Sequence, residues 1–371
     1  MKNIGVFTCA RSDYGILKKI INEININKKL KLNLFVCGSH LSQFYGNTIN
    51  EIKKEISKGI ILCPNIKFKN NEIDVASSYV NLTKIITKKI NKKIDLMIIL
   101  GDRYELLPIT NLCLLFGIKI AHIHGGETTE GAIDNNIRNS ISMMSNYHFV
   151  SNHKAKNKLL NFGIKKKNIF LLGSPSLENI NQNLYLKNYL EKKFKFKFLA
   201  KNAIVTYHPE TKNIKNVKKN LQILLESINY FSDINFIFTA PGADEKSKFI
   251  KDSIFAYVKK NKNTFFFDSL GHEEYLSFLK ICDFVIGNSS SAIIEAPSLK
   301  TVSLNIGIRQ KGRVKANSVV DLPFVKKKII KAIENIYKRK TLNNKFFKNP
   351  YDLNKKPSIE LVKQITKILK N

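Results

Sequence analysis

Arginine is rare in this sequence, and most copies follow apolar runs that are typical of strands. Lys and Arg together number 62, yet only six of these residues are Arg. A guanidinium group binds phosphate or carboxylate through a fixed fork of donors that a lysine ammonium lacks. Any one arginine could simply pair with a surface carboxylate, but five in such positions predict an anionic ligand along the carboxyl edge of a sheet. The five are Arg11, Arg103, Arg138, Arg309 and Arg313.

The segment DFVIGNSSSAIIEAPSLK carries the strongest local signal for phosphate binding. Its apolar run ends at Gly287, a polar turn follows, and a helix is expected to begin near Ala292. Backbone N–H groups and hydroxyls at the start of a helix suit a diphosphate, and Glu295 could accept hydrogen bonds from ribose hydroxyls. An ordinary helix cap would need one serine. The turn contains three: Ser289, Ser290 and Ser291.

Two other segments place cationic or polar groups after apolar runs. His208 lies in VTYHPET, where Pro209 stops the strand from continuing. The loop GIRQKGR contains Arg309 and Arg313, and its two glycines permit close approach of the backbone to a ligand. Because ligands bind at the carboxyl ends of parallel strands, we expect these side chains to contact the anion.

Carboxylates and histidines follow two further apolar runs, in GDRYE and HIHGGETTEGAIDNNIRNS. Carboxylates at several strand ends can provide an acid and a base if their environments separate their pKa values. His122 and His124 could share one strand face and bind a metal, but no third ligand has a suitable spacing, so no metal site is predicted. Two glycines before Glu127 fit a sharp turn that directs this carboxylate inward, although a turn with a solvent-facing Glu is the alternative. The acid/base candidates are Asp102, His124, Glu127 and Asp134.

The apolar runs themselves predict two α/β domains. They are continuous rather than alternating, as required of parallel strands covered by helices on both faces. A first series occupies residues 3–9, 32–37, 95–101, 118–124, 147–151 and 168–173, and a second occupies 203–208, 234–240, 263–269, 283–291 and 301–307. Two such series predict two Rossmann-like doubly wound domains, 1–172 and 173–355, with the seam within 173–200. A last helix in 356–371 is expected to return to the first domain.

Composition narrows the class of protein. The net charge is +33, but lysines are spread over the whole chain without zinc-ligand spacing, an RNA-binding signature or an Arg-rich helix, so no nucleic-acid partner is predicted. Five separated cysteines, most of them in or beside apolar runs, indicate reduced, mostly buried thiols. The sequence shows no leader in which basic residues are followed by an apolar stretch, as in a signal peptide. It also has no apolar run of about 18 residues, the length that spans a bilayer. We therefore expect a soluble cytoplasmic protein without a membrane partner.

Nine segments, in order, make the chain resemble the hydrolysing UDP-N-acetylglucosamine 2-epimerases nearly from end to end. They are ARSDYG, YGNTI, GDRYE, HIHGGE, IRNSISMMS, GSPS, HPET, GNSSSAIIEAPSLK and NIGIRQKGRV. The resemblance is to the bacterial branch of sialic acid and legionaminic acid synthesis. It implies a glycosyltransferase-B-like pair of Rossmann domains with the active site in the interdomain cleft. It also implies a UDP- or GDP-sugar substrate, no cofactor, no metal, and a homo-oligomer that is a dimer or tetramer.

The implied reaction starts from UDP-N-acetylglucosamine. The C2 proton is removed and UDP leaves C1 by anti-elimination, which forms 2-acetamidoglucal; water then adds and C2 is reprotonated on the opposite face to release N-acetylmannosamine. By analogy, Arg11, Ser289 and His208 would contact the diphosphate and Glu295 the ribose. The remaining expected binding residues are Arg138, Ser290, Ser291, Arg309 and Arg313.

Two departures from the family pattern leave the roles open. Much of the family has Glu at the position of His124, so His124 could itself transfer a proton, its usual pKa being near neutral. The family commonly has His where this chain has Asn139, which cannot transfer a proton at neutral pH. The same chemistry on a UDP- or GDP-2,4-diacetamido-2,4,6-trideoxyglucose is the first alternative. A glycosyltransferase with the same two-domain fold is the second alternative.

Overall fold

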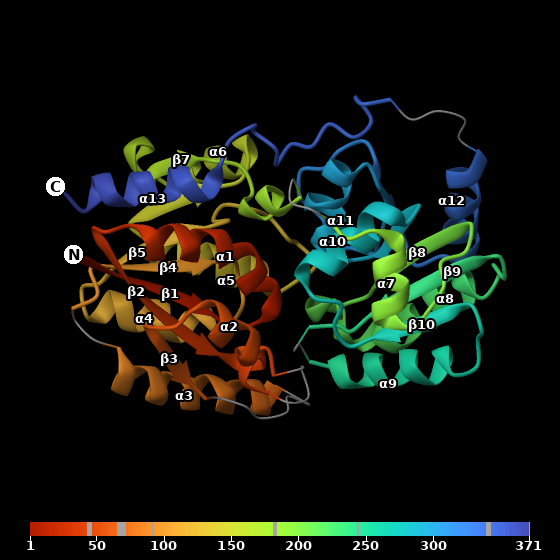
Figure 1. Cartoon of the computed structure of the whole chain (residues 1–371), viewed down its shortest axis with the longest axis horizontal. Helices are drawn as coiled ribbons and strands as arrows, with labels where there is room; N and C mark the ends of the chain where they lie inside the picture. Colours follow the sequence, from red (N-terminus) through yellow and green to blue (C-terminus); the bar gives the residue numbers. More distant parts are fainter. Residues whose placement is uncertain are drawn as a thin grey trace. The chain divides into compact units, whose positions relative to one another are not determined.

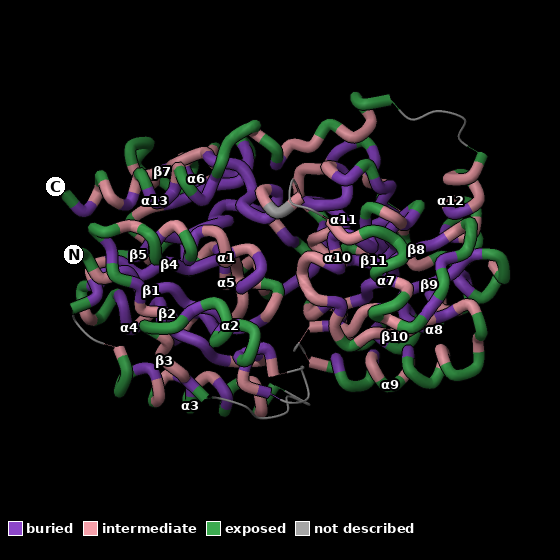
Figure 2. Tube along the Cα trace, in the orientation of Figure 1, coloured by how far each residue is buried: buried purple, intermediate pink, exposed green. Residues whose placement is uncertain are grey.

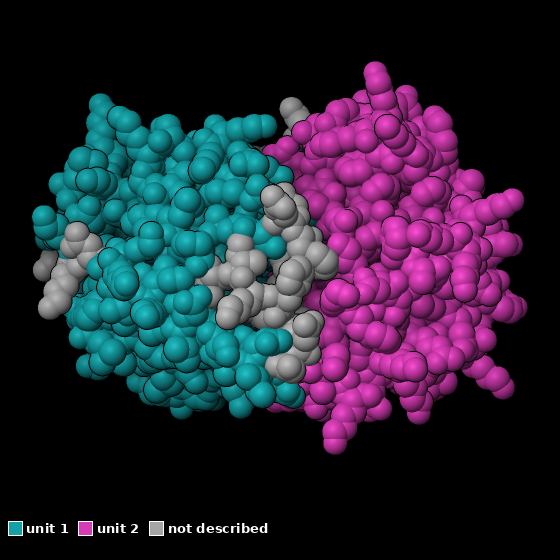
Figure 3. Space-filling view, turned by 90° about the horizontal axis from the view of Figure 1, so that it is seen from below, with its two compact units in different colours: residues 1–128, 133–178, 351–371 teal, residues 129–132, 179–350 magenta. Residues whose placement is uncertain are grey.

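The computed structural model describes residues 1–42, 47–64, 72–90, 93–180, 184–242, 245–338 and 343–370. Arg339 and part of the YGNTI segment lie outside these residues. The chain forms two compact units, shown in Figure 3. Unit 1 comprises Met1–Thr128, Ile133–Glu178 and Tyr351–Asn371, and unit 2 comprises Thr129–Ala132 and Asn179–Pro350.

Unit 1 is built on a seven-stranded parallel sheet with the order β3-β2-β1-β4-β5-β6-β7 (Figure 1). The chain winds outward from β1 in one direction and then from β4 in the other, so the sheet has its topological switch between these two strands. The strands are β1 (Lys2–Thr8), β2 (Leu30–Cys37), β3 (Ile60–Cys63), β4 (Leu96–Leu100), β5 (Lys119–Ile123), β6 (Tyr147–Val150) and β7 (Ile169–Leu171).

Helices cover both faces of this sheet, which explains the continuous apolar runs. Val6 and Ile98 belong to one core and their neighbours Phe7 and Ile99 to the other, because successive strand residues face opposite sides. The helices are α1 (Arg11–Ile26), α2 (Ile49–Glu55), α3 (Glu72–Lys89), α4 (Leu106–Leu115), α5 (Asp134–Met144), α6 (His153–Asn161) and α13 (Pro357–Ile368). Helix α13 packs against α1 and contributes Leu361 to the core of unit 1.

Unit 2 repeats this plan with six parallel strands in the order β10-β9-β8-β11-β12-β13. The strands are β8 (Lys201–Thr206), β9 (Ile234–Thr239), β10 (Thr264–Phe267), β11 (Phe284–Gly287), β12 (Val302–Ile306) and β13 (Val319–Leu322). The helices are α7 (Lys187–Phe194), α8 (Val217–Ile228), α9 (Ser247–Val258), α10 (His272–Ile281), α11 (Ser291–Ile294) and α12 (Lys326–Lys338). The strands of both sheets are mostly buried while helices expose their outer faces (Figure 2). The predicted pair of Rossmann-like doubly wound domains is confirmed.

Two expectations from composition can be compared with this fold. All five cysteines are buried and free, as predicted. Within the described ranges, no helix combines the length and apolar character that a membrane crossing requires.

Three buried histidines make the stability of unit 1 sensitive to acid. Burial lowers the pKa of His40 and His122 to about 3 and that of His148 to about 4. An unfolded histidine titrates near pH ~6.5, so below that pH the unfolded chain takes up protons that the native unit does not. The free energy of unfolding therefore falls as the pH falls. We expect each histidine to remove up to about 2 kcal/mol between about pH 6.5 and about pH 4.5.

Urea unfolding measured across this pH range checks the expectation. His40→Gln should flatten the decline, since His40 lies buried between the hydroxyls of Thr8 and Thr48. His153→Gln, at the exposed start of α6, should retain the wild-type slope. Equal slopes for wild type and His40→Gln would contradict the assignment.

Candidate functional site

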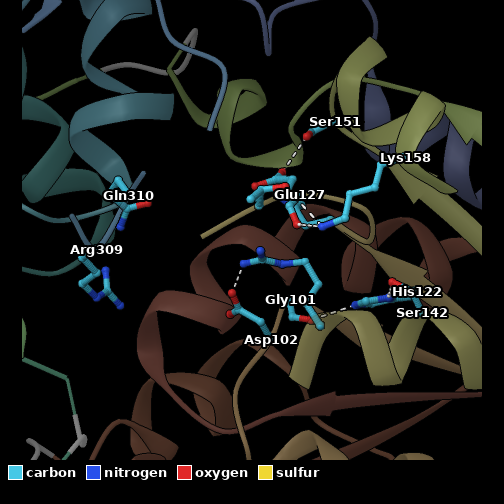
Figure 4. Close-up of polar contacts among 12 residues, drawn as sticks. Gly101, Asp102, His122, Glu127, Ser142, Ser151, Lys158, Arg309 and Gln310 are labelled. Atoms are coloured by element: carbon cyan, nitrogen blue, oxygen red, sulfur yellow. Dashed lines mark hydrogen bonds and ion pairs between the residues drawn. The ribbon is translucent and has the colours of Figure 1, made fainter. Parts of the chain in front are cut away.

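Glu127 is the centre of a buried hydrogen-bond chain at the carboxyl end of β5. Only 3% of the residue is exposed, and its Oε1 accepts hydrogen bonds from Ser151 Oγ at 2.6 Å and from His124 Nδ1 at 2.7 Å. On the other side of the imidazole, Nε2 lies 3.3 Å from Ser174 Oγ, which in turn contacts Ser176. The carboxylate therefore points inward, and the alternative of a solvent-facing Glu is wrong. Figure 4 shows Glu127 with Ser151.

The backbone around Glu127 is shaped for this inward turn. Strand β5 ends at Ile123, and His124 adopts a left-handed conformation with φ of 62°, which is uncommon for a residue other than glycine. Gly126 also has a positive φ, of 77°, and a side chain there would overlap the carbonyl of Ala155. A non-glycine residue held at positive φ stores strain, and such residues cluster at functional sites.

His122 and His124 do not form a pair, contrary to the sequence-based view that they could share one strand face. His122 hydrogen-bonds Ser142 Oγ through Nδ1 at 3.1 Å and the carbonyl of Gly101 through Nε2 at 2.7 Å. Both of its ring nitrogens are thus used inside unit 1, and its low pKa keeps the ring neutral. We assign His122 to holding the turn that carries Asp102. Among the described residues, no group of three or more His, Cys, Asp or Glu is placed to hold a metal ion.

Asp102, labelled in Figure 4, follows β4 and forms an ion pair with Arg138 of α5. Arg138 is 1% exposed and the side chain of Asp102 is 21% exposed, so a buried cation faces a carboxylate that solvent still reaches. A neighbouring cation favours the ionised form of a carboxylic acid. The acid/base candidate Asp102 and the predicted ligand contact Arg138 are therefore partners of each other.

Lys158, on α6, is a neighbour of Glu127 that the sequence did not indicate. Its Nζ donates to the Glu127 carbonyl at 3.3 Å and to Thr128 Oγ1 at 3.2 Å. Figure 4 shows Lys158 beside Glu127. Burial lowers the pKa of Lys158, and the charge of Arg138 lowers it further. Lys158, Ser151 and Ser174 stand far from HIHGGE in the chain, and no local pattern marks them.

Of the three other candidates of unit 1, Arg11 and Asp134 lie at the starts of helices. Arg11 is the first residue of α1, and its charge, with that of Arg103, helps to lower the pKa of the buried His40. Arg103 itself is bound by Glu105 at 3.2 Å. Asp134 is the half-buried first residue of α5, one turn before Arg138.

In unit 2, Asn288 ties together the ends of three strands. Its side chain accepts from the backbone N–H of His208 at 2.7 Å and donates to the His208 carbonyl at 2.8 Å. Its own carbonyl accepts from Arg309 Nη1 at 3.1 Å and from Gln310 Nε2 at 2.9 Å. His208 and Arg309, predicted separately, are thus brought together by Asn288 (Arg309 and Gln310 in Figure 4).

Glu210 orders the loop after β12 from within. It is buried, and its Oε1 accepts from the backbone N–H groups of Ile308 at 2.6 Å and Arg309 at 3.2 Å. Burial raises the pKa of Glu210, and these two hydrogen bonds oppose that shift. The loop continues to Arg313, whose N–H donates to the carbonyl of Gln310 at 3.3 Å.

The helix that follows the turn of Ser289, Ser290 and Ser291 is shorter than the sequence predicted. The expected helix is a single turn, α11, followed by a 3-10 helix, Ala296–Leu299, that contains Pro297. Because the α-helix is so short, an anion at this turn would be bound by hydroxyls and side chains and not by a helix dipole. Glu295 is buried at the junction, and its charge adds to the burial that raises the pKa of Tyr275 to about 12. The turn itself holds Ser289, Ser290 and Ser291, with Ser291 N–H donating to Ser289 Oγ at 3.4 Å.

Comparison with known proteins gives three findings. The family model described as UDP-N-acetylglucosamine 2-epimerase matches residues 22–364. The chain is 38% identical to the GDP/UDP-N,N'-diacetylbacillosamine 2-epimerase (hydrolyzing) of Campylobacter jejuni, over 86% of this chain and 84% of that protein. It is 35% identical to the polysialic acid biosynthesis protein P7 of Escherichia coli, over 90% and 85%.

The fold is also shared with a solved structure, that of UDP-GlcNAc 2-epimerase from Neisseria meningitidis bound to UDP-GlcNAc. The TM-score is 0.79 at 17% identity, and all of both chains is covered. At that identity the likeness establishes a common fold.

Proposed function

Since the chain belongs to the UDP-N-acetylglucosamine 2-epimerase family, we propose that it hydrolyses a nucleotide-linked 2-acetamido sugar with inversion at C2. The observation that carries this proposal is the inward Glu127–His124 pair in the same unit as the Asp102–Arg138 pair. Elimination followed by hydration needs one group to take a proton and another to return one on the opposite face. We assign these two tasks to the two differently arranged carboxylates of unit 1, Glu127 and Asp102.

Asp102 is assigned as the base that removes the C2 proton. Arg138 favours its ionised form, and its partial exposure lets substrate reach it. The C1–O bond then breaks with its electrons on the diphosphate, and C1 and C2 become doubly bonded. The result is the 2-acetamidoglucal.

Glu127 and His124 are assigned as the pair that returns a proton to C2. Their 2.7 Å contact lets a proton be held between carboxylate and imidazole. Water adds its hydroxyl to C1, the remaining proton of that water restores the Glu127–His124 pair, and Asp102 releases the proton taken from C2 to solvent. Asp134, the first residue of α5, stays a candidate acid/base group.

Departure of the diphosphate is the assigned task of the cationic groups. A C2 hydrogen is weakly acidic, so elimination depends on stabilising negative charge on the leaving group. In unit 2, Arg309 has a buried Nε without a hydrogen-bond partner among the described residues, which a phosphate oxygen would satisfy. His208 Nδ1 accepts from the N–H of Gly242 at 3.1 Å, so a neutral ring carries its proton on Nε2. The other proposed contacts are Arg11, Ser289, Ser290, Ser291 and Arg313 for the diphosphate and Glu295 for the ribose.

Two substrates are proposed, in order. Identity of 38% to a protein named for GDP/UDP-N,N'-diacetylbacillosamine favours a 2,4-diacetamido-2,4,6-trideoxyglucose linked to GDP or UDP. Identity of 35% to a polysialic acid biosynthesis protein supports UDP-N-acetylglucosamine, which would yield N-acetylmannosamine for a sialic-acid-type sugar.

We further propose that the protein is cytoplasmic and forms a dimer or tetramer. Its free, buried cysteines fit a reducing compartment. Light scattering tests the assembly.

Proton NMR in deuterated buffer tests the reaction and the substrate together. The purified protein is incubated separately with GDP- and UDP-N,N'-diacetylbacillosamine and with UDP-N-acetylglucosamine. We expect release of the nucleoside diphosphate and a free sugar of inverted C2 that carries deuterium at C2. The substrate with the highest kcat/KM decides between the two proposals. Folded protein that releases no nucleotide from any of them, or a product without C2 deuterium, would overturn the proposed reaction.

A further inference from the structure

Four residues between the candidate acid/base groups belong to unit 2 although the chain on both sides belongs to unit 1. These residues, Thr129–Ala132, are called the strap below. Glu127 precedes the strap with only Thr128 between them, and Asp134 follows it after Ile133. The strap is therefore joined covalently, at both ends, to the groups to which we assign the chemistry.

Hydrogen bonds and an ion pair fasten the strap to unit 2. The backbone N–H of Glu130 donates to the Lys311 carbonyl at 2.9 Å, and Lys311 Nζ lies 3.0 Å from Glu130 Oε2. The backbone N–H of Lys212 donates to the Gly131 carbonyl at 3.4 Å. Thr129 and Ala132, at the two ends, are buried. The strap is thus held by two separate loops of unit 2.

Gly131 allows the closest approach in this contact. A Cβ atom built there would overlap the carbonyl oxygen of Ile308 and would lie 2.8 Å from the Cα of Arg309. These are backbone atoms, so they cannot rotate out of the way. Gly131 does not have a positive φ, and alanine is therefore excluded by space alone and not by backbone strain.

The loop under the strap is itself tied to the candidate nucleotide contacts. Glu210 holds the backbone of Ile308 and Arg309, and Arg309 and Gln310 both donate to the carbonyl of Asn288. The side chain of Asn288 forms hydrogen bonds with the backbone N–H and the carbonyl of His208. A chain of direct contacts therefore leads from His208 to the strap.

Lys158 completes the connection on the unit 1 side. Its two hydrogen bonds fix the Glu127 carbonyl and the Thr128 hydroxyl at the point where the chain leaves unit 1. After the strap, the chain returns directly into α5, whose Arg138 pairs with Asp102. A shift of the strap would pull on both carboxylate arrangements, because one residue of chain spans at most about 3.6 Å.

We propose that the strap positions Glu127 and the start of α5 according to the state of the Arg309 loop in unit 2, so that the bound nucleotide aligns the acid/base groups through the backbone. This inference rests on the proposed function. Gly131 and the Glu130–Lys311 pair are positioning residues and not catalytic ones. A displacement of about 1 Å in reacting groups can cost about 100-fold in rate.

Gly131→Ala tests the proposal by lifting the strap off Ile308. We expect kcat to fall about 10-fold or more, while KM, UDP affinity and the melting temperature stay within about 2-fold or about 2 °C of wild type. Unchanged kcat would overturn the proposal. A parallel loss of UDP affinity and melting temperature would also overturn it, because the strap would then be only a structural part of unit 2.

A charge swap supplies a second variant that leaves the fold unaltered. Glu130→Lys sets two cations against each other and should lower kcat about 3-fold, since the pair is exposed. Adding Lys311→Glu should restore kcat, and failure of this rescue would contradict the role of the pair. Lys248→Gln breaks a comparably exposed pair with Asp252 on α9 and should not change kcat.

Hydrogen–deuterium exchange separates this inference from the proposed function. UDP should protect the peptide 124–134 in wild type, and Gly131→Ala should remove that protection even though UDP still binds. This readout needs no turnover. If the wild-type protein shows the protection but turns over no substrate, the proposed function is contradicted and the strap proposal is not. If UDP binds and leaves the peptide unprotected in wild type, the strap proposal is contradicted and the proposed function is not.

Discussion

Glu127→Gln is expected to lower kcat at least about 1000-fold while the protein stays folded and binds UDP normally. The amide keeps an oxygen that can accept from Ser151 and His124, so the buried hydrogen bonds that hold the turn are largely retained. What is lost is the ability to hold and return a proton. The rate is measured by NMR and the affinity for UDP by calorimetry.

Two comparisons make this result specific. Glu51→Gln on the exposed face of α2 is a matched change of the same chemistry and should leave kcat unaltered. Ser151→Ala removes one donor to Glu127 and should reduce kcat by about 10-fold, less than loss of the carboxylate. If Glu127→Gln turns over at the wild-type rate, Glu127 is a turn residue and its assignment to proton transfer fails.

Asp102→Asn should abolish turnover and also destabilise unit 1. Without the Asp102 carboxylate, the almost completely buried guanidinium of Arg138 loses the negative charge that compensates its own positive charge. Breaking one side of a buried pair typically costs about 3 kcal/mol. We therefore expect a drop in kcat of at least about 1000-fold together with a lower free energy of unfolding in urea.

A double variant separates the two effects. Asp102→Asn combined with Arg138→Met removes both charges and should recover most of the stability, because replacing a buried pair with apolar groups is often neutral. Activity should stay lost. Recovery of turnover in the double variant, or wild-type kcat in Asp102→Asn alone, would remove Asp102 from the chemistry.

The sheets were largely predictable because most strands are continuous apolar runs. The exceptions are β3 and β13, the outer strands next to β2 and β12. Each has four residues, and several of these are only half-buried. A short edge strand carries too few residues for a periodicity to be recognised, and only its pairing with a neighbour identifies it. The shortness of α11 was also missed, although Pro297 stands close behind it.

The amino-acid sequence by itself determined the family, the two α/β domains and the candidate residue types at the strand ends. These depend on local runs of residues and on ordered motifs, which a linear chain displays directly. Tertiary structure decided the partnerships: Glu127 with Ser151, His124 with Ser174 50 residues away, and Asp102 with Arg138. It also separated His122 from His124 and placed the strap in unit 2. These partners meet only when strands that are far apart in the sequence pair in one sheet. The spacing of two residues along the chain does not reveal how far apart they lie in space.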